Sequence, residues 1–427
     1  MPTTAPVQRQ LDEATARAAE LDEADRLATF TDAFLPASDG ALRAYLDGNS
    51  LGRPPKEALA AMDDFIRNRW GTRLIQGWTD EWMRWPLEVG DELAAAALEA
   101  APGQTVIADS TSVLLYKLAR AALTTVHGRS EILVDTDNFP TDRYLLEGIA
   151  TELGLVLRWI ETDPATGVTP EAVAEAVSEQ TALFVGSHVA YRSGYVADVA
   201  RITQVVHGAG GRVLWDLCHS VGSVPIRLDD WQVDFAVGCG YKYLNGGPGA
   251  PAFGYVHREL QDRASQPIQG WMGHAEPFVM GPGYTRAAGI QGFITGTPPI
   301  LAMIPLRVGI AMLSEATIAD VRTKSLALTD FALELIDDWL VPLGVELASP
   351  RDHIHRGGHL TIRRPGFEQV NQALWARGVI GDFRSPDGIR LGPAPLSTTF
   401  VEVALALADL RDLLTPATAE SPPPSTP

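Results

Sequence analysis

Cysteine is scarce in this chain, and its scarcity excludes two kinds of stabilising centre. Only two cysteines occur among 427 residues, Cys218 and Cys239, each inside an apolar stretch and without a CxxC or histidine spacing nearby. Disulfide frameworks and zinc sites need a larger and regularly spaced set. We therefore expect neither a disulfide nor a metal, and a reducing compartment.

Positive charge is also in short supply. The chain has 34 lysines and arginines against 53 aspartates and glutamates, which gives a net charge of -19. Such an excess of negative charge repels phosphate backbones and anionic membrane surfaces. We therefore expect no nucleic-acid partner and no membrane partner.

Long apolar runs are missing from the N-terminal stretch, where a signal peptide or a membrane span would need one. The stretch is acidic, whereas a transit peptide would be basic. The composition, 46% hydrophobic and 20% charged, is that of a folded globular protein. We expect a cytoplasmic protein with a large core.

What the chain does have is a series of short apolar runs that alternate with amphipathic segments from about residue 104 onward. Uninterrupted runs of this kind, separated by helical patterns, are typical of parallel strands buried on both faces. The pattern predicts an α/β fold with a mainly parallel sheet. The runs are TVIA, EILV, VLRWI, ALFVG, RVLW, DFAVGC and AFGYV.

The pattern divides the chain into four segments. Residues 1–75 are predicted to be an N-terminal helical segment that belongs to a small domain, and residues 76–310 a large α/β domain. A long helix from Ala311 to Trp339 opens residues 311–414, whose short strands and helices predict the rest of the small α+β domain. The tail, residues 415–427, is rich in Pro, Ser and Thr and is predicted to be disordered.

Polar residues follow the predicted strands directly, at the edge of the sheet where such folds bind ligands. Asp216 follows RVLW, and Lys242 follows DFAVGC. A lysine that forms a Schiff base and a carboxylate that pairs with a pyridine nitrogen are the pair that pyridoxal 5′-phosphate chemistry needs. The two residues therefore predict a pyridoxal-phosphate site. Taken singly, Lys242 could instead extend to water, and Asp216 could be an exposed loop acid or a cap.

Other residues at the strand ends each have two interpretations. Ser110 and Thr111 precede an amphipathic helix, so their hydroxyls either bind a phosphate at the helix N-terminus or act as plain N-caps. Phe139 either stacks on a flat cofactor ring or packs against the helix that follows it. His219 is either a cofactor contact or a core histidine.

Taken together, the motifs resemble those of the kynureninases, pyridoxal-phosphate enzymes of the aspartate aminotransferase fold type (fold type I). The resemblance runs from about residue 47 to residue 400. GNSLG, GWMGH, GTPPIL and an arginine near the end are not expected as a set in relatives such as cysteine desulfurases. The other shared motifs are NFPTD, SHVAYRSG, DLCHSVG and YKYLNGGPG.

The resemblance implies a role for each matched residue at the cofactor. Lys242 would form the Schiff base, and Asp216 would pair with the pyridine nitrogen. Tyr241 would hold the phosphate together with Ser110 and Thr111. The remaining implied cofactor contacts are Phe139, Asp142, Ser187 and His219 from the same subunit, and Trp271 and Thr297 across the interface of a homodimer.

The resemblance also implies how an amino-acid substrate would be bound. Arg390 would clamp the substrate α-carboxylate with its guanidinium fork, although an arginine there could equally be a solvated edge residue. Ser50, in GNSLG, would be a second substrate contact. Trp78 stands about where animal members carry a histidine that helps choose the ring-hydroxylated substrate. An indole favours flat apolar stacking, so we expect unsubstituted kynurenine, unless Trp78 only packs near Trp82 in the core.

The implied activity is hydrolytic cleavage of the Cβ–Cγ bond of L-kynurenine, or of 3-hydroxykynurenine. The products would be L-alanine and anthranilate, or 3-hydroxyanthranilate. Lys242 would remove the Cα proton, and the neutral phenol of Tyr241 would relay protons in later steps. Two alternatives stay open: another enzyme of the same fold type, such as a cysteine desulfurase-like lyase or an aminotransferase, and a pyridoxal-phosphate-binding protein without turnover.

Overall fold

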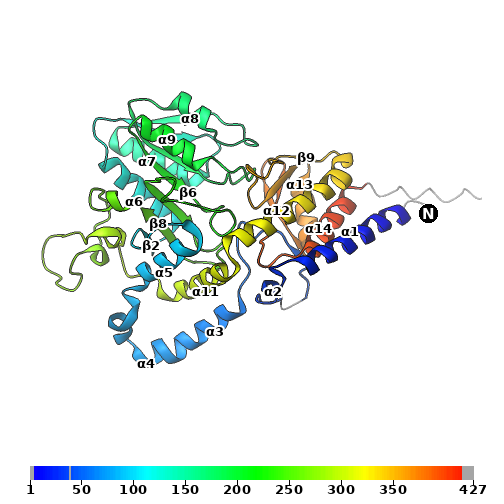
Figure 1. Ribbon diagram of the computed structural model, residues 1–427, viewed down its shortest axis with the longest axis horizontal. Helices are drawn as coiled ribbons and strands as arrows, with labels where there is room; N and C mark the ends of the chain where they lie inside the picture. The colour runs from blue at the N-terminus through cyan, green and yellow to red at the C-terminus, as the bar shows by residue number, and fades with distance from the viewer. Residues whose placement is uncertain (1–3, 38–39, 416–427) are drawn as a thin grey trace, which may run out of the picture.

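The computed structural model describes residues 4–37 and 40–415. The predicted disordered tail therefore lies outside the described residues, apart from Thr415. Two main sheets form the centres of two domains, which lie on the left and on the right of Figure 1.

The large domain is built on a seven-stranded sheet. Its strands are β2 (Thr105–Ala108), β3 (Glu131–Asp135), β4 (Val156–Ile160), β5 (Thr181–Ser187), β6 (Arg212–Asp216), β7 (Phe235–Cys239) and β8 (Ala252–Val256). Their order is β2-β8-β7-β6-β5-β3-β4. Strand β8 is antiparallel to both neighbours, and the other adjacent pairs are parallel. Each predicted apolar run forms one of these strands, so the prediction of a mainly parallel sheet is confirmed.

Successive residues of a central strand enter different hydrophobic cores, because side chains alternate across a sheet. Leu133 lies in one core, whereas its neighbours Ile132 and Val134 lie in another. Helices therefore cover both faces. They are α5 (Trp85–Leu93), α8 (Pro170–Ala176), α9 (Val199–Gly208) and α11 (Ile300–Ala316) on one face, and α6 (Thr111–Thr124) and α7 (Pro140–Leu153) on the other.

Strand β4 departs from the prediction that these runs are buried. Val156 is 56% exposed and Trp159 is 38% exposed. The strand lies at the edge of the sheet, beside β3, so only part of its surface is covered. An apolar run indicates a strand, but it does not indicate the position of that strand in the sheet.

The small domain is built on an antiparallel sheet in the order β12-β13-β10-β9. Its strands are β9 (Glu346–Leu347), β10 (Leu360–Arg363), β12 (Asp382–Arg384) and β13 (Gly388–Leu391). Its helices are α12 (Ile318–Leu335), α13 (Phe367–Ala376) and α14 (Phe400–Leu414). The N-terminal helix α1 (Thr4–Ala24) packs against α14, and β1 (Ala44–Tyr45) pairs with β11 (Val379–Ile380).

The predicted long helix from Ala311 to Trp339 is interrupted. Helix α11 ends at Ala316 and α12 begins at Ile318, with a bend of 85° between them. Thr317, at the break, has a φ of 61°, and its hydroxyl accepts a hydrogen bond from the N–H of Asp320. No glycine or proline marks this break in the sequence. Within the described ranges, no single helix has the length and apolar composition of a membrane span, and α11 and α12 meet those criteria only as a bent pair.

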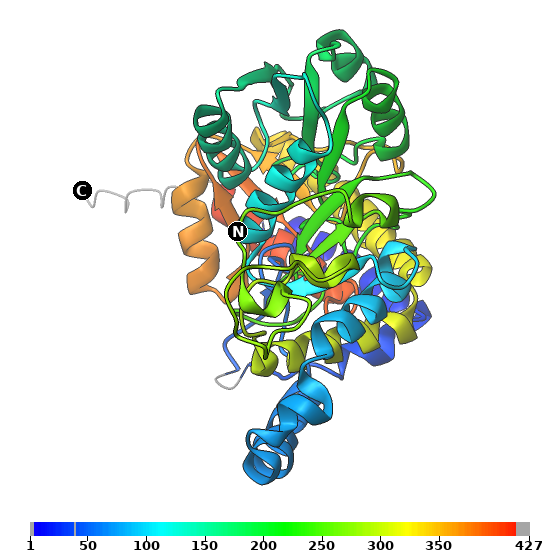
Figure 2. The same cartoon turned by 90° about the vertical axis from the view of Figure 1, so that its left-hand side faces the viewer.

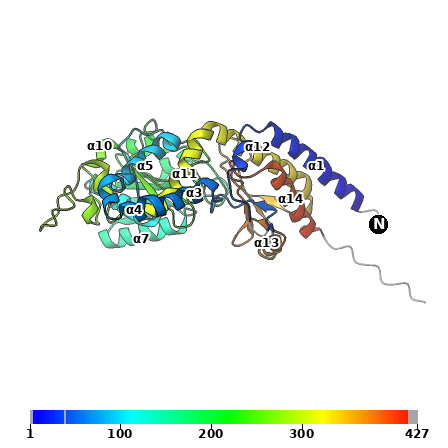
Figure 3. The same ribbon diagram turned by 90° about the horizontal axis from the view of Figure 1, so that it is seen from below.

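Two segments project from the large domain. The first comprises α3 (Lys56–Asp64), η1 (Phe65–Trp70) and α4 (Gly71–Arg73), and it extends downward from the body in Figure 2. The second is the loop between α10 (Arg258–Gln261) and η5 (Gly289–Phe293), which extends to the left in Figure 3. Both carry exposed apolar side chains, such as Leu59 at 63% and Met280 at 78%. The remaining short helices are α2 (Ala28–Thr31), η2 (Trp78–Trp82), η3 (Ala94–Leu98), η4 (Trp271–Gly273), η6 (Ile336–Leu340) and η7 (Val341–Leu343).

Candidate active site

The turn after β7 places Lys242 at the carboxyl edge of the large sheet. The side chain is 8% exposed, so the alternative that it extends to water is wrong. Its Nζ lies 3.0 Å from Nε2 of His219, which follows β6. The same Nζ lies 5.9 Å from the centre of the Tyr241 ring. Two neighbouring strand ends thus bring an amine, an imidazole and a phenol together.

Two buried carboxylates lie in the same region. Asp216 ends β6, is 5% exposed, and accepts a hydrogen bond at 2.7 Å from the N–H of Cys218. Asp142, in the first turn of α7, is 3% exposed, and its Oδ2 has no hydrogen-bond partner among the described residues. Burial, and then the nearby Asp216, raise the pKa of Asp142 well above its ordinary value. A buried acceptor without a partner is costly, so this corner fits a further polar group.

The start of α6 is the predicted anion site. Ser110 occupies the N-cap position, but its hydroxyl makes no cap hydrogen bond, so the plain-cap alternative is wrong for it. The thiol of Cys218 lies 3.9 Å from Oγ1 of Thr111, which places this helix start beside the Asp216 segment. Asp109, the residue before Ser110, has a φ of 48°, in the left-handed region that residues with a Cβ seldom adopt.

A buried lysine that the sequence analysis missed lies behind this helix start. Lys117, in α6, is fully buried. Its Nζ donates hydrogen bonds to Oδ2 of Asp109 at 2.8 Å, to Oγ1 of Thr295 at 2.6 Å and to the carbonyl oxygen of Phe293. Burial lowers the pKa of Lys117, and Asp109 opposes that shift. Its signal in the sequence is a lysine on the apolar face of SVLLYKLARAAL.

The loop after β3 and the end of β5 form another side of the site. Ser187 donates a hydrogen bond at 3.0 Å to Oδ1 of Asn138. The same oxygen accepts a hydrogen bond at 2.7 Å from the N–H of Phe139. The Phe139 ring lies edge-on to that of Tyr191, with centroids 5.4 Å apart. The motif NFPTD therefore contributes Asn138 as well as the predicted residues.

Arg390 enters from β13 of the small domain. It is 1% exposed, so the alternative of a solvated edge arginine is wrong. Its guanidinium donates to Oγ of Ser50 at 2.8 Å and to the carbonyl oxygen of Tyr191 at 2.7 Å. It also donates from Nε to Oδ2 of Asp382 at 2.8 Å. Asp382 was not predicted, and it lies opposite Arg390 in the β12–β13 pair.

Three histidines in this region are buried. Burial lowers the pKa of His188 and of His359 to about 3, and it lowers that of His219 well below its ordinary value. The rings of His219 and His359 lie 5.9 Å apart. His359 was not predicted. It precedes Thr361, the partner of Arg390 in the β10–β13 pair, by two residues, and so points to the same face of the sheet as Arg390.

The phenol of Tyr241 remains protonated at neutral pH. Burial raises its pKa above the ordinary value, and the nearby thiols of Cys239 and Cys218 raise it further. A half-buried phenol of this kind can donate a proton where a carboxylate would be ionised.

Three other predicted residues lie at the surface of the large domain. Trp78 is half-buried, packs edge-on against Trp82 at 5.5 Å, and lines an apolar pocket of about 460 Å³ together with Pro298. Thr297, the neighbour of Pro298, is exposed. Trp271 is 41% exposed and lies on the second projecting segment. Trp78 and GTPPIL therefore share one surface region.

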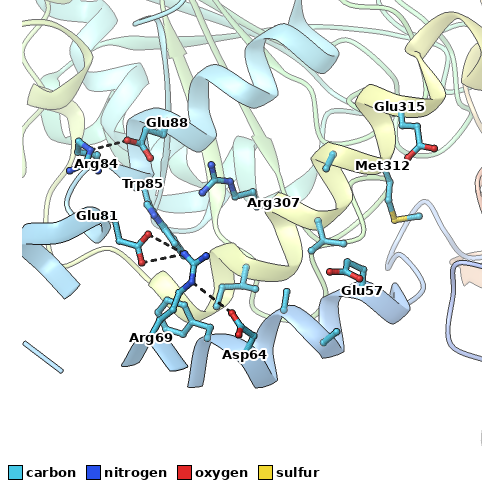
Figure 4. Close-up of a pocket in the computed structure, with 16 residues that line it drawn as sticks. Glu57, Asp64, Arg69, Glu81, Arg84, Trp85, Glu88, Arg307, Met312 and Glu315 are labelled. Carbon is cyan, nitrogen blue, oxygen red and sulfur yellow. Dashed lines mark hydrogen bonds and ion pairs between the residues drawn. The ribbon is translucent and has the colours of Figure 1, made fainter. Parts of the chain in front are cut away.

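A cavity of about 1040 Å³ lies between the first projecting segment and α11 (Figure 4). Its charged residues mostly pair with one another: Arg69 with Asp64 and Glu81, and Arg84 with Glu88. The described residues that line it include no lysine, cysteine, serine or histidine. Its size alone therefore does not make it the site of the chemistry.

A mainly parallel seven-stranded sheet with a buried lysine at its carboxyl edge, next to a smaller α+β domain, defines fold type I. Solved structures agree with this class. A cysteine desulfurase from Escherichia coli has a TM-score of 0.78 at 18% identity and covers 91% of this chain and 98% of its own. An apo cysteine desulfurase from Thermococcus onnurineus NA1 has a TM-score of 0.76 at 21% identity, with 87% and 94% covered. Likeness at this identity shows the fold alone.

Sequence comparison narrows the fold to a family. Residues 321–410 match the model of the kynureninase C-terminal domain. A kynureninase from Pseudomonas fluorescens is 40% identical over 402 residues, which are 92% of this chain and 94% of that protein. A kynureninase from Burkholderia pseudomallei (strain 1106a) is 42% identical over the same length and shares. The chain belongs to the kynureninase family, as its motifs predict.

Proposed function

We propose that this protein is a pyridoxal-phosphate-dependent kynureninase that hydrolyses L-kynurenine to anthranilate and L-alanine. The observation that carries the proposal is the buried amine of Lys242, 3.0 Å from His219. It lies at the strand ends that also carry Asp216 and Tyr241, and the kynureninase family supplies the reaction. A mutant of a solved cystine C–S lyase of the same fold is described with glycine covalently linked to its pyridoxal-phosphate cofactor.

The residues present fit that cofactor. Oδ2 of Asp142 has no hydrogen-bond partner among the described residues, and the hydroxyl of Ser110 makes no cap hydrogen bond to the start of α6. Lys242 would bind the aldehyde carbon, Asp216 the pyridine nitrogen, and Ser110 and Thr111 the phosphate. The other proposed contacts are Phe139, Asp142, Ser187, His219 and Tyr241. When bound, the cofactor would supply an electron sink for negative charge at the substrate Cα.

Lys242 is the proposed base for the substrate Cα proton. Its amine would be free to take up a proton whenever it is not bonded to the cofactor. His219 is held neutral by burial, so its ring nitrogen can accept a hydrogen bond from that amine and orient it. Burial of both groups keeps water away from the proton that is transferred.

Arg390 is the proposed clamp for the substrate α-carboxylate. A guanidinium binds a carboxylate through two parallel hydrogen bonds, and Ser50 lies within 2.8 Å of one of its nitrogens. Asp382 holds the guanidinium in place from the other side. The clamp would therefore fix the amino-acid end of the substrate.

Tyr241 is the proposed proton donor in the later part of the reaction. Water would add to the side-chain ketone, the Cβ–Cγ bond would break, and Tyr241 would then donate a proton. Its raised pKa keeps the phenol protonated across neutral pH, which a donor at that step requires. The alternative role for Tyr241 is only to bind the phosphate.

The proposed substrate is kynurenine without a ring hydroxyl. Trp78 offers an apolar indole face and a single N–H donor, and it lies in an apolar pocket with Pro298. Such a surface suits an unsubstituted aminophenyl ring better than a phenolic one.

The proposed active form is a homodimer whose sites include residues of both subunits. Trp271 and Thr297, the residues implied to reach the other subunit, are both exposed. The segments around them carry exposed apolar side chains, among them Phe278 at 65% and Leu301 at 38%. Exposed apolar groups of this kind are typical of protein interfaces.

The test is a comparison of substrates with purified protein. We expect visible absorption after addition of pyridoxal phosphate, a borohydride adduct on Lys242, and fluorescent anthranilate from kynurenine at a higher kcat/KM than 3-hydroxyanthranilate from 3-hydroxykynurenine. Sulfide from cysteine, or a keto acid in place of anthranilate, would assign the protein to another reaction of the same fold. Absorption without any product would indicate a binding protein.

A further inference from the structure

We propose that Lys117 is a positioning residue that holds the phosphate-binding end of the site in its shape. The proposal rests on the proposed function, because it takes the start of α6 as the place where the cofactor phosphate binds. Lys117 does not itself reach that phosphate. Its Nζ is fully enclosed by oxygen atoms of the protein, namely those of Asp109, Thr295 and Phe293.

The first part of the argument is the backbone at Asp109. Its φ of 48° is unfavourable for a residue with a Cβ, and strained residues persist where the surrounding structure holds them. This turn connects the end of β2 to the start of α6, where Ser110 is the N-cap and Thr111 the first helical residue. The carbonyl oxygen of Asp109 is bound by the N–H of Ala252, and its carboxylate is bound by Lys117. The ammonium of Lys117 thus holds the side-chain end of the strained residue.

The second part is the segment on the other side of the same ammonium. Phe293 and Thr295 precede Thr297 by four and two residues, so their bonds to Lys117 fix the start of GTPPIL. A pocket of about 280 Å³ lies between the two sides and is lined by Asp109, Thr295 and Thr297 among others. The side chain of Lys117 therefore sets the distance between the start of α6, where the phosphate is proposed to bind, and the GTPPIL segment, which is proposed to contact a second subunit.

The alternative is that Lys117 only stabilises the core. The chain contains a second buried lysine–aspartate pair for this comparison: Nζ of Lys324 lies 2.6 Å from Oδ2 of Asp25. Lys324 is nearly as buried as Lys117, and Asp25 is more deeply buried than Asp109. Lys324 belongs to α12 of the small domain, away from the start of α6. Loss of either lysine leaves an aspartate without its ion pair, so both substitutions should lower stability. Only the loss of Lys117 should alter recognition of a phosphate.

The experiment compares two aldehydes that differ only in that phosphate. The cofactor-free full-length wild type, K117M and K324M are titrated with pyridoxal 5′-phosphate and with pyridoxal, and the dissociation constants are read from imine absorption. We expect K117M to weaken binding of the phosphorylated aldehyde roughly tenfold, as for other groups that hold a ligand's direct contacts in place, with the affinity for pyridoxal within about twofold. K324M should leave the ratio of the two constants unchanged.

Equal losses for both aldehydes in K117M, or no loss for either, would overturn the proposal and leave a structural role. If K117M does not yield folded protein, D109N takes its place, because asparagine tolerates the left-handed backbone while it removes the charge bound by Lys117. D109N should change the ratio in the same direction, and an unchanged ratio overturns the proposal.

The wild type distinguishes failure of the proposed function from failure of this inference. A wild type that forms no imine with either aldehyde would overturn both. Normal wild-type binding with an unchanged ratio in the variant would overturn this inference alone.

Discussion

The two walls of the site differ in how their polar groups are satisfied. The large-domain wall, Lys242 with Asp216 and Asp142, contains a buried carboxylate oxygen without a partner among the described residues. In the small-domain wall, Arg390 with Ser50, the guanidinium already bonds to protein oxygens on several sides. The unpartnered oxygen suits a cofactor that stays bound at the large-domain wall. The small-domain wall suits a substrate that binds and dissociates, because its carboxylate would replace or share the partners that Arg390 already has.

The largest effect is expected on the large-domain wall. Lys242→Ala removes both the proposed bond to the cofactor and the proposed base, so kcat/KM for kynurenine should fall at least about a thousandfold and imine absorption should vanish. Anthranilate fluorescence and visible spectra measure the two effects. The exposed Lys56→Ala is a control that should match the wild type, and activity within about tenfold of normal in K242A would exclude Lys242 as the base.

The next effect separates chemistry from cofactor binding on the same wall. Tyr241→Phe keeps the ring and loses the phenolic proton, so kcat should fall roughly a hundredfold or more. The affinity for pyridoxal phosphate should change only a few-fold, about the value of one neutral hydrogen bond. Steady-state kinetics and cofactor titration test this prediction. A normal kcat would show that Tyr241 does not donate a proton and would limit its role to binding the phosphate.

On the small-domain wall the effect should be on substrate affinity. Arg390→Lys keeps the charge but loses the fork, so KM should rise roughly tenfold or more while kcat changes less. Imine absorption should stay normal, which distinguishes this wall from the other. If instead kcat alone falls, Arg390 acts in the transition state and the contrast between the walls is wrong.

The smallest effect concerns acid stability. Burial holds the pKa of His359 at about 3 in the folded protein, whereas an unfolded histidine titrates near about 6.5. Below that pH the unfolded state takes up a proton that the folded state does not, so stability is complete above pH 6.5 and falls as the pH drops toward 3. The free energy of unfolding should fall by about 1.4 kcal/mol for each pH unit below 6.5 because of His359, and His359→Gln should abolish this contribution.

Urea unfolding at pH 7.5 and at pH 5.5 measures that difference. Asp135, whose pKa burial raises to about 7, acts in the opposite direction in this range, but it does so equally in both proteins. The same pH dependence in His359→Gln and in the wild type would show that this histidine is not the source.

The sequence predicts the large domain better than the contacts between domains. Apolar runs identify all seven strands, because a strand buried on both faces is apolar at successive positions. The residues after β6 and β7 are predicted as site residues, because such sheets bind ligands at the carboxyl ends of their strands. Asp382 and His359 could not be found in this way, because they face Arg390 only through the pairing of short strands in the small sheet. Lys117 was missed for a related reason: its partners Thr295 and Phe293 are far away in the sequence.

The bend at Thr317 has a mechanical consequence. Ile310 and Leu313 of α11 pack in the large-domain core, whereas Leu328 and Phe331 of α12 pack in the small-domain core. The corner between the two helices therefore sets the distance from the sheet edge that bears the amine to the strand that bears the guanidinium. A residue that favoured one straight helix at this corner would move the two halves of the candidate site out of alignment without contacting either of them.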